Sequence, residues 1–185
     1  PMPTFIVGQT GTLTRLTEQV GHYDFEAAIS LAEMAKSYGV GLKEHNADYL
    51  DDVTLLEHTP ANVTASNVAP QYGTEETRAY LKLCDVEDLM VKEGLLKADD
   101  VSCLRNTLLV KAIETERWRK WMVCYQVNLT VEQILADHKL SLDILDISGH
   151  YAFNNDEVKA ATEHLYKNLA QFNIDGQRFV VDHIK

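Results

Sequence analysis

The sequence predicts a mixed α/β protein, with a small parallel sheet in its first half and helices in its second half. Short apolar runs are followed by polar turns and then by amphipathic helices, an order typical of parallel βαβ units. These runs do not alternate between apolar and polar residues, as expected for strands that are buried on both faces. From about Asp99 onward only helical periodicity is present.

The first strand is expected at residues 5–7, before a Gly-rich turn at residues 8–12. Asp24 is a suitable N-cap for a helix, and Gly39 is a suitable residue to end it. One face of this helix is apolar: Phe25, Ala28, Ile29, Ala32 and Ala35. These features predict a first βα unit.

Two further βα units are predicted to follow. Residues 40–42 form the second strand, and Asp51 and Asp52 open a short helix that must end before Pro60. Residues 63–68 form the third strand, and Thr74 is expected to cap a longer helix.

The second half shows two apolar helical stripes, at residues 101–113 and 158–172. Between them lie a capping box from Thr130 to Gln133 and a basic-aromatic segment at residues 116–121. We interpret that segment as a docking surface between helices, although its cations could also reach an anionic substrate. The expected division is therefore a βα part at residues 1–95 and a helical extension at residues 96–185.

Composition argues against several classes of protein. A formal net charge of −11 argues against nucleic-acid binding, which needs clustered Lys and Arg. No apolar run approaches the roughly 20 residues needed to span a bilayer, and no signal peptide is recognisable. The three cysteines are far apart and indicate neither a disulfide framework nor a zinc knuckle. We expect a cytoplasmic protein with neither nucleic-acid nor membrane partners.

Polar residues follow each predicted strand, and the densest group is the stretch LKEHNADYL at residues 42–50. Parallel strands end at one edge of a sheet, where ligands usually bind. His45 is a candidate metal ligand, with a structural role as the alternative. Glu44 and Asp48 are candidate catalytic bases, or caps of the following turn. Strand alternation would place Glu44 and His45 on opposite faces, unless the strand has already ended before His45.

Six further residues at these strand ends are candidate contacts for a sugar or a phosphate, since they offer amides, hydroxyls and backbone N–H groups. They are Gln9, Thr10, Thr12, Asn46, Asn67 and Gln71. The alternative is ordinary turn chemistry. Lys43 could contact a phosphate or form a Schiff base, although a solvated lysine is the more common case.

Three parallel strands cannot close a barrel, and they leave edges that native proteins cover. A (β/α)8 barrel typically needs about 250 residues. We therefore expect either the C-terminal piece of a larger protein or a subunit that completes its sheet with a partner.

The motifs resemble those of the non-catalytic subunit family of class II tagatose-bisphosphate aldolases, formerly labelled tagatose-6-phosphate kinases, over most of the chain. The matching residues fall in four groups: Ile6-Val7-Gly8-Gln9-Thr10-Gly11; His45, Asp48 and Tyr49; Val68, Pro70 and Arg78; and Trp118 with Lys120. The chain departs from the family pattern at Lys43, Asn67 and Leu13, which suggests a divergent branch.

The resemblance implies a (β/α)8 TIM barrel, of which this chain holds the last three βα units and a C-terminal helical extension. It further implies that His45 and Asp48 face a sugar or sugar-phosphate site with a divalent metal such as zinc. The implied function is ketose or ketose-phosphate chemistry, as a subunit of the aldolase. Its partners would be the aldolase catalytic subunit or further copies of the chain.

Three alternatives to this function stay open. The protein could be a metal-dependent ketose or ketouronate C4-epimerase in its own right. It could also be a purely stabilising subunit, or an α/β binding protein whose sugar-like site is coincidental. We expect this chain alone not to be active.

Overall fold

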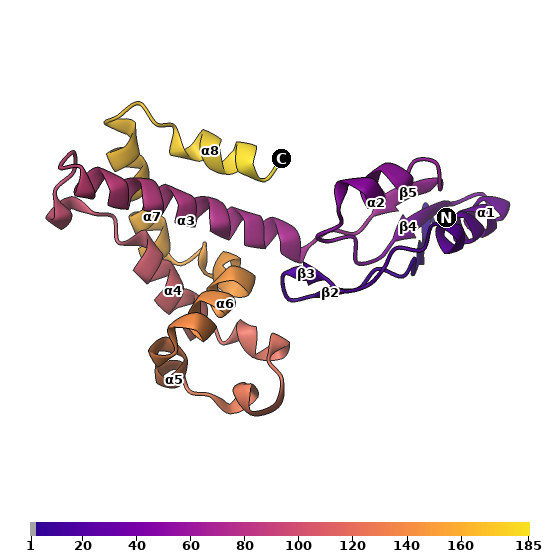
Figure 1. The fold of residues 1–185 in the computed structure, drawn as a ribbon, viewed down its shortest axis with the longest axis horizontal. Helices are drawn as coiled ribbons and strands as arrows, with labels where there is room; N and C mark the ends of the chain where they lie inside the picture. Colours follow the sequence, from indigo (N-terminus) through magenta and orange to yellow (C-terminus); the bar gives the residue numbers. More distant parts are fainter. Residues whose placement is uncertain (1–2) are drawn as a thin grey trace. The chain divides into compact units, whose positions relative to one another are not determined.

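The computed structural model describes residues 3–185 as a mixed α/β structure in which helices predominate (Figure 1). The chain forms two compact units, which we call the sheet unit, ending at Gln71, and the helical unit, Tyr72–Lys185. The sequence places the division near residue 95 instead. The difference arises from helix α3 (Pro70–Lys92), because its buried residues Leu83 and Met90 belong to the core of the helical unit.

The sheet unit contains the three predicted parallel strands, β1 (Phe5–Gly8), β4 (Gly41–Glu44) and β5 (Val63–Ser66). Their order in the sheet is β1-β4-β5. Gly8 is in register with Glu44, and Glu44 with Ser66, so the three strands end side by side. The predicted parallel sheet is confirmed, and within residues 3–185 it is open at both edges.

Helix α1 (Phe25–Ser37) covers one face of this sheet. The Asp24 carboxylate accepts a hydrogen bond from the Ala27 N–H at 2.9 Å, which confirms the predicted N-cap. Ala32 and Ala35 pack against Leu42 of β4. The small alanine side chains allow the helix to approach the sheet closely.

The second predicted helix is also present as α2 (Asp52–Glu57), where Asp51 accepts from the Thr54 N–H at 2.8 Å. A two-stranded antiparallel hairpin was not predicted: β2 (Thr14–Arg15) and β3 (Glu18–Gln19). Its strands have two residues each, too few for a periodic pattern to emerge.

The prediction that Thr74 caps the third helix is wrong. Helix α3 begins at Pro70, and Thr74 is buried within it. Proline is well tolerated in the first turn of a helix, where its missing N–H has no intrahelical partner. The capping group comes from Asp48, 22 positions before Pro70, which local sequence patterns cannot reveal.

The helical unit contains no strand among its described residues, as predicted. Its elements after α3 are η1 (Ala98–Asp100), α4 (Leu104–Glu114), η2 (Arg117–Trp121), η3 (Cys124–Asn128), α5 (Val131–Ala136), α6 (His138–Ser148), η4 (Gly149–Ala152), α7 (Asp156–Ala170) and α8 (Gly176–His183). The capping box at Thr130 and Gln133 is confirmed. Within residues 3–185, no helix is both long enough and apolar enough to cross a membrane.

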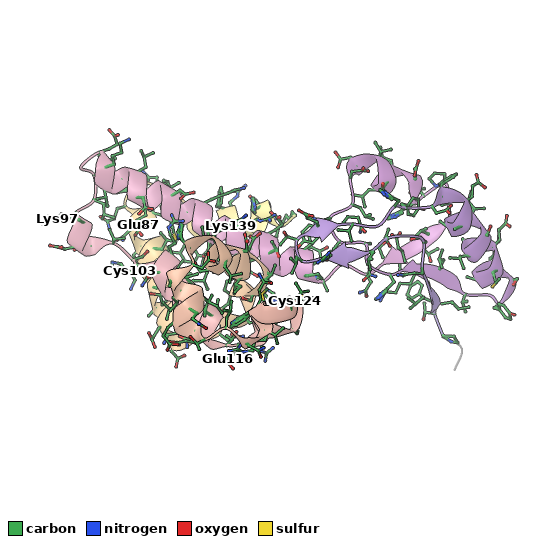
Figure 2. The ribbon with its side chains drawn as sticks, turned by 60° about the horizontal axis from the view of Figure 1, so that its bottom comes forward. Glu87, Lys97, Cys103, Glu116, Cys124 and Lys139 are labelled. Carbon is green, nitrogen blue, oxygen red and sulfur yellow. The ribbon has the colours of Figure 1, made fainter. Side chains whose placement is uncertain are left out.

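Two apolar clusters form the core of the helical unit. The larger joins α3, α4 and α7, and the smaller surrounds Trp118, whose indole N–H donates to the Ile113 carbonyl at 2.8 Å. Glu87, labelled in Figure 2, is buried in α3. Its carboxyl group accepts from the Ser102 hydroxyl at 2.6 Å and from the Asn168 amide at 2.7 Å, so both of its buried oxygens are hydrogen-bonded.

Candidate functional site

The three polar segments that follow the strands lie against one another. The His45 N–H donates to the Gly8 carbonyl at 3.1 Å, and the Asn67 N–H donates to the Glu44 carbonyl at 3.0 Å. The Ala47 N–H in turn donates to the Asn67 carbonyl at 3.1 Å. The prediction that these segments share one edge of the sheet is confirmed.

The unpredicted β2–β3 hairpin fixes this edge. Gln19 of β3 donates from its amide to the carbonyls of Asn46 and Asp48, each at 3.0 Å. The Thr12 hydroxyl donates to the His45 carbonyl at 2.7 Å. Thr12 is therefore a buried structural contact, and the backbone of residues 45–48 is held by side chains from the preceding segment.

Glu44 is fully buried on the face of the sheet that α1 covers. The Thr10 hydroxyl donates to its Oε1, and His58 Nε2 lies 2.7 Å from its Oε2. The second contact has the distance of an ion pair but not the alignment of a hydrogen bond, so Oε2 has no hydrogen-bond donor among the described residues. Thr10 and Glu44 thus contact each other inside the unit.

Tyr23 completes this buried group, which we call the Glu44 cluster (Thr10, Tyr23, Glu44 and His58). The Tyr23 ring meets the His58 ring edge to face at 5.3 Å, and its hydroxyl is buried without a hydrogen-bond partner in the described chain. Burial, and then the charges of Glu44 and Glu57, raises the pKa of Tyr23 to about 12. Neither Tyr23 nor His58 belongs to a motif, so the sequence did not indicate them.

Asp48 is buried at the start of α3. Its Oδ1 accepts from the N–H groups of Ala69 at 2.9 Å and Gln71 at 3.0 Å. The Gln71 side chain in turn accepts from the Tyr49 N–H at 2.8 Å. Both side chains therefore stabilise the turn into the helix. For Asp48 this is the capping role that we gave as the alternative to a catalytic base.

His45 is exposed and directly follows β4, which ends at Glu44, so the predicted alternation does not extend to it. We call the side of the sheet opposite α1 the open face. A side chain at Gly8 would point to the covered side, because an added Cβ there would meet Leu42 and Leu31. The neighbouring Val7 in β1 therefore points to the open face, and its side chain is 59% exposed. His45 thus stands at the end of an open sheet surface.

The remaining candidate contacts keep part of their side chains accessible. Gln9 is exposed, and its amide makes only a long contact of 3.5 Å with the Thr12 carbonyl. Asn46 and Asn67 are half-buried, and Asn46 has a left-handed backbone with φ of 59°. Gln9, Asn46 and Asn67 are the predicted contacts that best fit a ligand at this edge.

The residues present do not by themselves fit a metal ion. Neither neighbouring carboxylate is available beside His45, because Glu44 is buried against Thr10 and His58 and Asp48 is held by the helix amides. Across residues 3–185, no group of three or more His, Cys, Asp or Glu side chains is arranged to hold a metal. A structural site needs about four ligands, so His45 would have to be joined by ligands from elsewhere.

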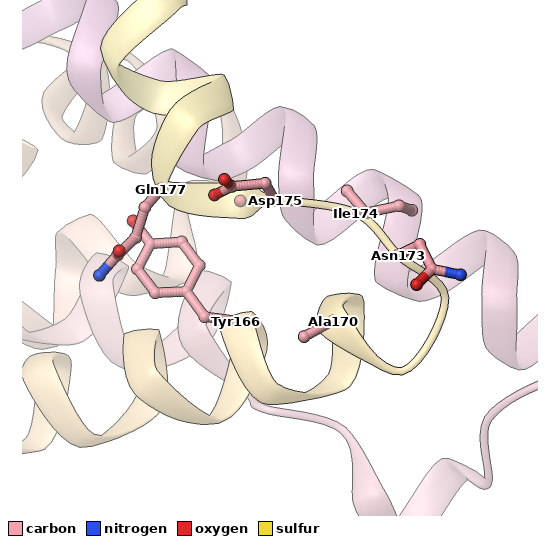
Figure 3. A pocket seen from close by; sticks show the side chains of 7 residues that line it. Tyr166, Ala170, Asn173, Ile174, Asp175 and Gln177 are labelled. Carbon is pink, nitrogen blue, oxygen red and sulfur yellow. The ribbon is translucent and has the colours of Figure 1, made fainter.

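A separate hollow of about 410 Å³ lies in the helical unit, where α7 leads into α8 (Figure 3). Its lining is Tyr166, Ala170, Asn173, Ile174, Asp175, Gly176 and Gln177. Asp175 caps α8 by accepting from the Arg178 N–H at 2.9 Å. Burial, and then contact with Tyr80, raises the pKa of Tyr166, so its hydroxyl stays neutral. The hollow offers no reactive group.

No family model matches the chain, and no curated protein matches it. The family resemblance therefore stays a prediction that depends on the motifs.

Proposed function

We propose that the sheet unit is part of a (β/α)8 barrel and that the protein acts on a ketose or ketose phosphate as a subunit of a class II tagatose-bisphosphate aldolase. The strand order β1-β4-β5 follows the sequence, as around a barrel. Both α1 and the end of α2 lie on the covered face, through Leu42 and through the Glu44–His58 contact. The open face then corresponds to the barrel interior.

The observation that carries this proposal is the position of His45, exposed directly after β4 at the carboxyl edge of the sheet. Barrel enzymes bind substrates at this edge. His45, Gln9 and Asn67 would donate hydrogen bonds to sugar hydroxyls or to a phosphate. The Glu44 cluster and Asp48 would hold the loop that carries His45, without contacting the substrate.

The engagement of both carboxylates favours the aldolase subunit over the C4-epimerase. An epimerase needs a base that can reach the substrate, and here Glu44 is buried while Asp48 binds two backbone amides. A metal shared with a partner would use His45 as one ligand and would take the others from strands outside residues 3–185.

The test is a calorimetric titration of the full chain with D-tagatose 6-phosphate, with and without zinc. The variant is His45→Ala, and the matched control is His164→Ala, which removes an exposed histidine from α7 of the helical unit. We expect the unaltered chain and the control to bind alike, and His45→Ala to bind about tenfold more weakly, as for the loss of one charge-assisted hydrogen bond.

Binding that is equal in all three proteins would place the sugar phosphate elsewhere and reject the role of His45. No binding by any of them would reject substrate recognition by this chain. The stabilising role would then be tested by co-purification with a class II aldolase catalytic subunit.

A further inference from the structure

Two cations of the basic-aromatic segment converge on one tyrosine of the helical unit. The Arg117 guanidinium lies 4.9 Å from the centre of the Tyr151 ring, and Lys120 Nζ lies 5.1 Å from it. Lys120 also donates to the Tyr151 hydroxyl at 3.0 Å and lies 4.8 Å from the Trp121 ring. Residues 30 positions apart in the sequence thus form one group, which we call the Tyr151 patch (Arg117, Lys120, Trp121, His150 and Tyr151).

The charges of this patch are not neutralised by the described residues. Neither Arg117 nor Lys120 forms an ion pair there, although the chain carries 28 acidic residues. The neighbouring Arg119 differs, since it binds Glu116 at 2.7 Å and the carbonyls of Val127 and Leu129. Two like charges beside one ring repel each other, and a bound anion would relieve that repulsion.

His150 extends the patch into the interior. Its ring lies against Tyr151 at a tilt of 43° with centroids 4.0 Å apart, and its buried Nδ1 has no hydrogen-bond partner in the described chain. Burial, and then the charges of Lys120 and Arg117, lowers the pKa of His150. Its ring position is fixed by Gly73 of α3, where an added Cβ would lie 2.5 Å from His150 Cγ.

We propose that the Tyr151 patch binds a small oxyanion of the phosphate type. Arg117 offers a planar fork of donors, Lys120 offers a compact charge, and the Tyr151 hydroxyl offers a further polar contact. A protein partner fits less well, because a stable interface covers about 800 Å² on each side. The uncompensated positive charge here is confined to the surroundings of one ring. This inference does not depend on the proposed function.

The test is a calorimetric titration of the full chain with inorganic phosphate, with sodium chloride at matched ionic strength as the reference. The variants are Lys120→Gln and Arg117→Gln, and the control is Lys97→Gln. Lys97 is exposed beyond α3 and well apart from Glu116, the residue before η2 (Figure 2). All three variants remove one positive charge, so a general effect of net charge would appear equally in each.

We expect saturable binding of one phosphate per chain, weakened about tenfold in each patch variant and unchanged in Lys97→Gln. Absence of saturable binding in the unaltered chain would overturn the proposal, as would equal weakening in all three variants. Binding of poly-glutamate without binding of phosphate would also overturn it, in favour of an acidic protein partner. Unchanged thermal unfolding in the variants would show that the loss is not caused by misfolding.

Discussion

The two units differ in what they bury. The helical unit buries large side chains from several elements: Leu83, Leu104, Leu108, Ile113, Trp118, Ile134, Ile144, Leu145, Leu165 and Leu169. In the sheet unit the fully buried hydrophobic residues are alanines and one large side chain, Leu42, while Phe5, Ile6 and Val7 are exposed. The helical unit therefore has a complete core, whereas the sheet unit covers one face of its sheet and leaves the other open.

This difference indicates two sources of stability. Apolar packing stabilises the helical unit, at about 1.5–3 kcal/mol for each large side chain that is fully buried. The sheet unit depends more on the hydrogen bonds at its strand ends, which contribute about 1 kcal/mol each. Three substitutions test this difference between the units.

The largest effect is expected for Trp118→Ala in the core of the helical unit. Removal of this buried indole leaves a cavity and takes one of its hydrogen bonds from the Ile113 carbonyl, so we expect a loss of about 4 kcal/mol in the free energy of unfolding. Urea unfolding followed by circular dichroism measures it. The control is Trp121→Ala, which truncates an indole that is 38% exposed and should cost about 1 kcal/mol or less. Equal losses would contradict the proposed core.

An intermediate effect is expected for Asp48→Ala in the sheet unit. Two backbone amides lose their acceptor, so we expect a loss of about 2 kcal/mol in the free energy of unfolding. Asp48→Asn keeps an oxygen acceptor and should restore most of that stability. If Asp48→Asn kept its stability but lost ligand binding or activity, Asp48 would have a chemical role besides its structural one.

The smallest effect is expected for Glu44→Gln, through Tyr23. Removing the Glu44 charge should lower the pKa of Tyr23 from about 12 while leaving it above 10, because burial is the main cause of the shift. The measurement is the alkaline titration of tyrosinate absorbance, with Tyr23→Phe to identify the Tyr23 contribution. Glu57→Gln should give a smaller change of the same sign. An unchanged titration in Glu44→Gln would refute this electrostatic coupling.

The same shift predicts a dependence of stability on pH. The unfolded chain loses the Tyr23 proton near pH 10, whereas the folded chain keeps it up to about pH 12. The contribution of protonated Tyr23 to the free energy of unfolding is therefore complete below pH 10, and it is lost as the pH rises from about 10 to about 12. The Tyr23→Phe variant should lack that part of the dependence.

Much of the fold was predictable because its signals are local. The three strands lie between turn residues, and the caps at Asp24, Asp51 and Thr130 act within three positions along the chain. These features depend on neighbouring residues alone, so a single sequence contains them.

The incorrect and missing predictions concern contacts between distant residues. Thr74 has the form of an N-cap, but Asp48 supplies the group that starts α3. Tyr23 and His58 meet Glu44 only in the folded unit, and the Tyr151 patch combines η2 with η4. The spacing of residues along the chain does not predict such contacts between distant residues. Knowledge of the whole arrangement is needed to separate the structural carboxylates from the exposed His45.

The unpaired edges of the sheet affect how the protein will behave in the laboratory. Strands β1 and β5 each have only β4 as a neighbour in the described chain, so their outer N–H and C=O groups can pair with another molecule. Together with the exposed Phe5 and Val7, these edges should make the purified chain prone to concentration-dependent association.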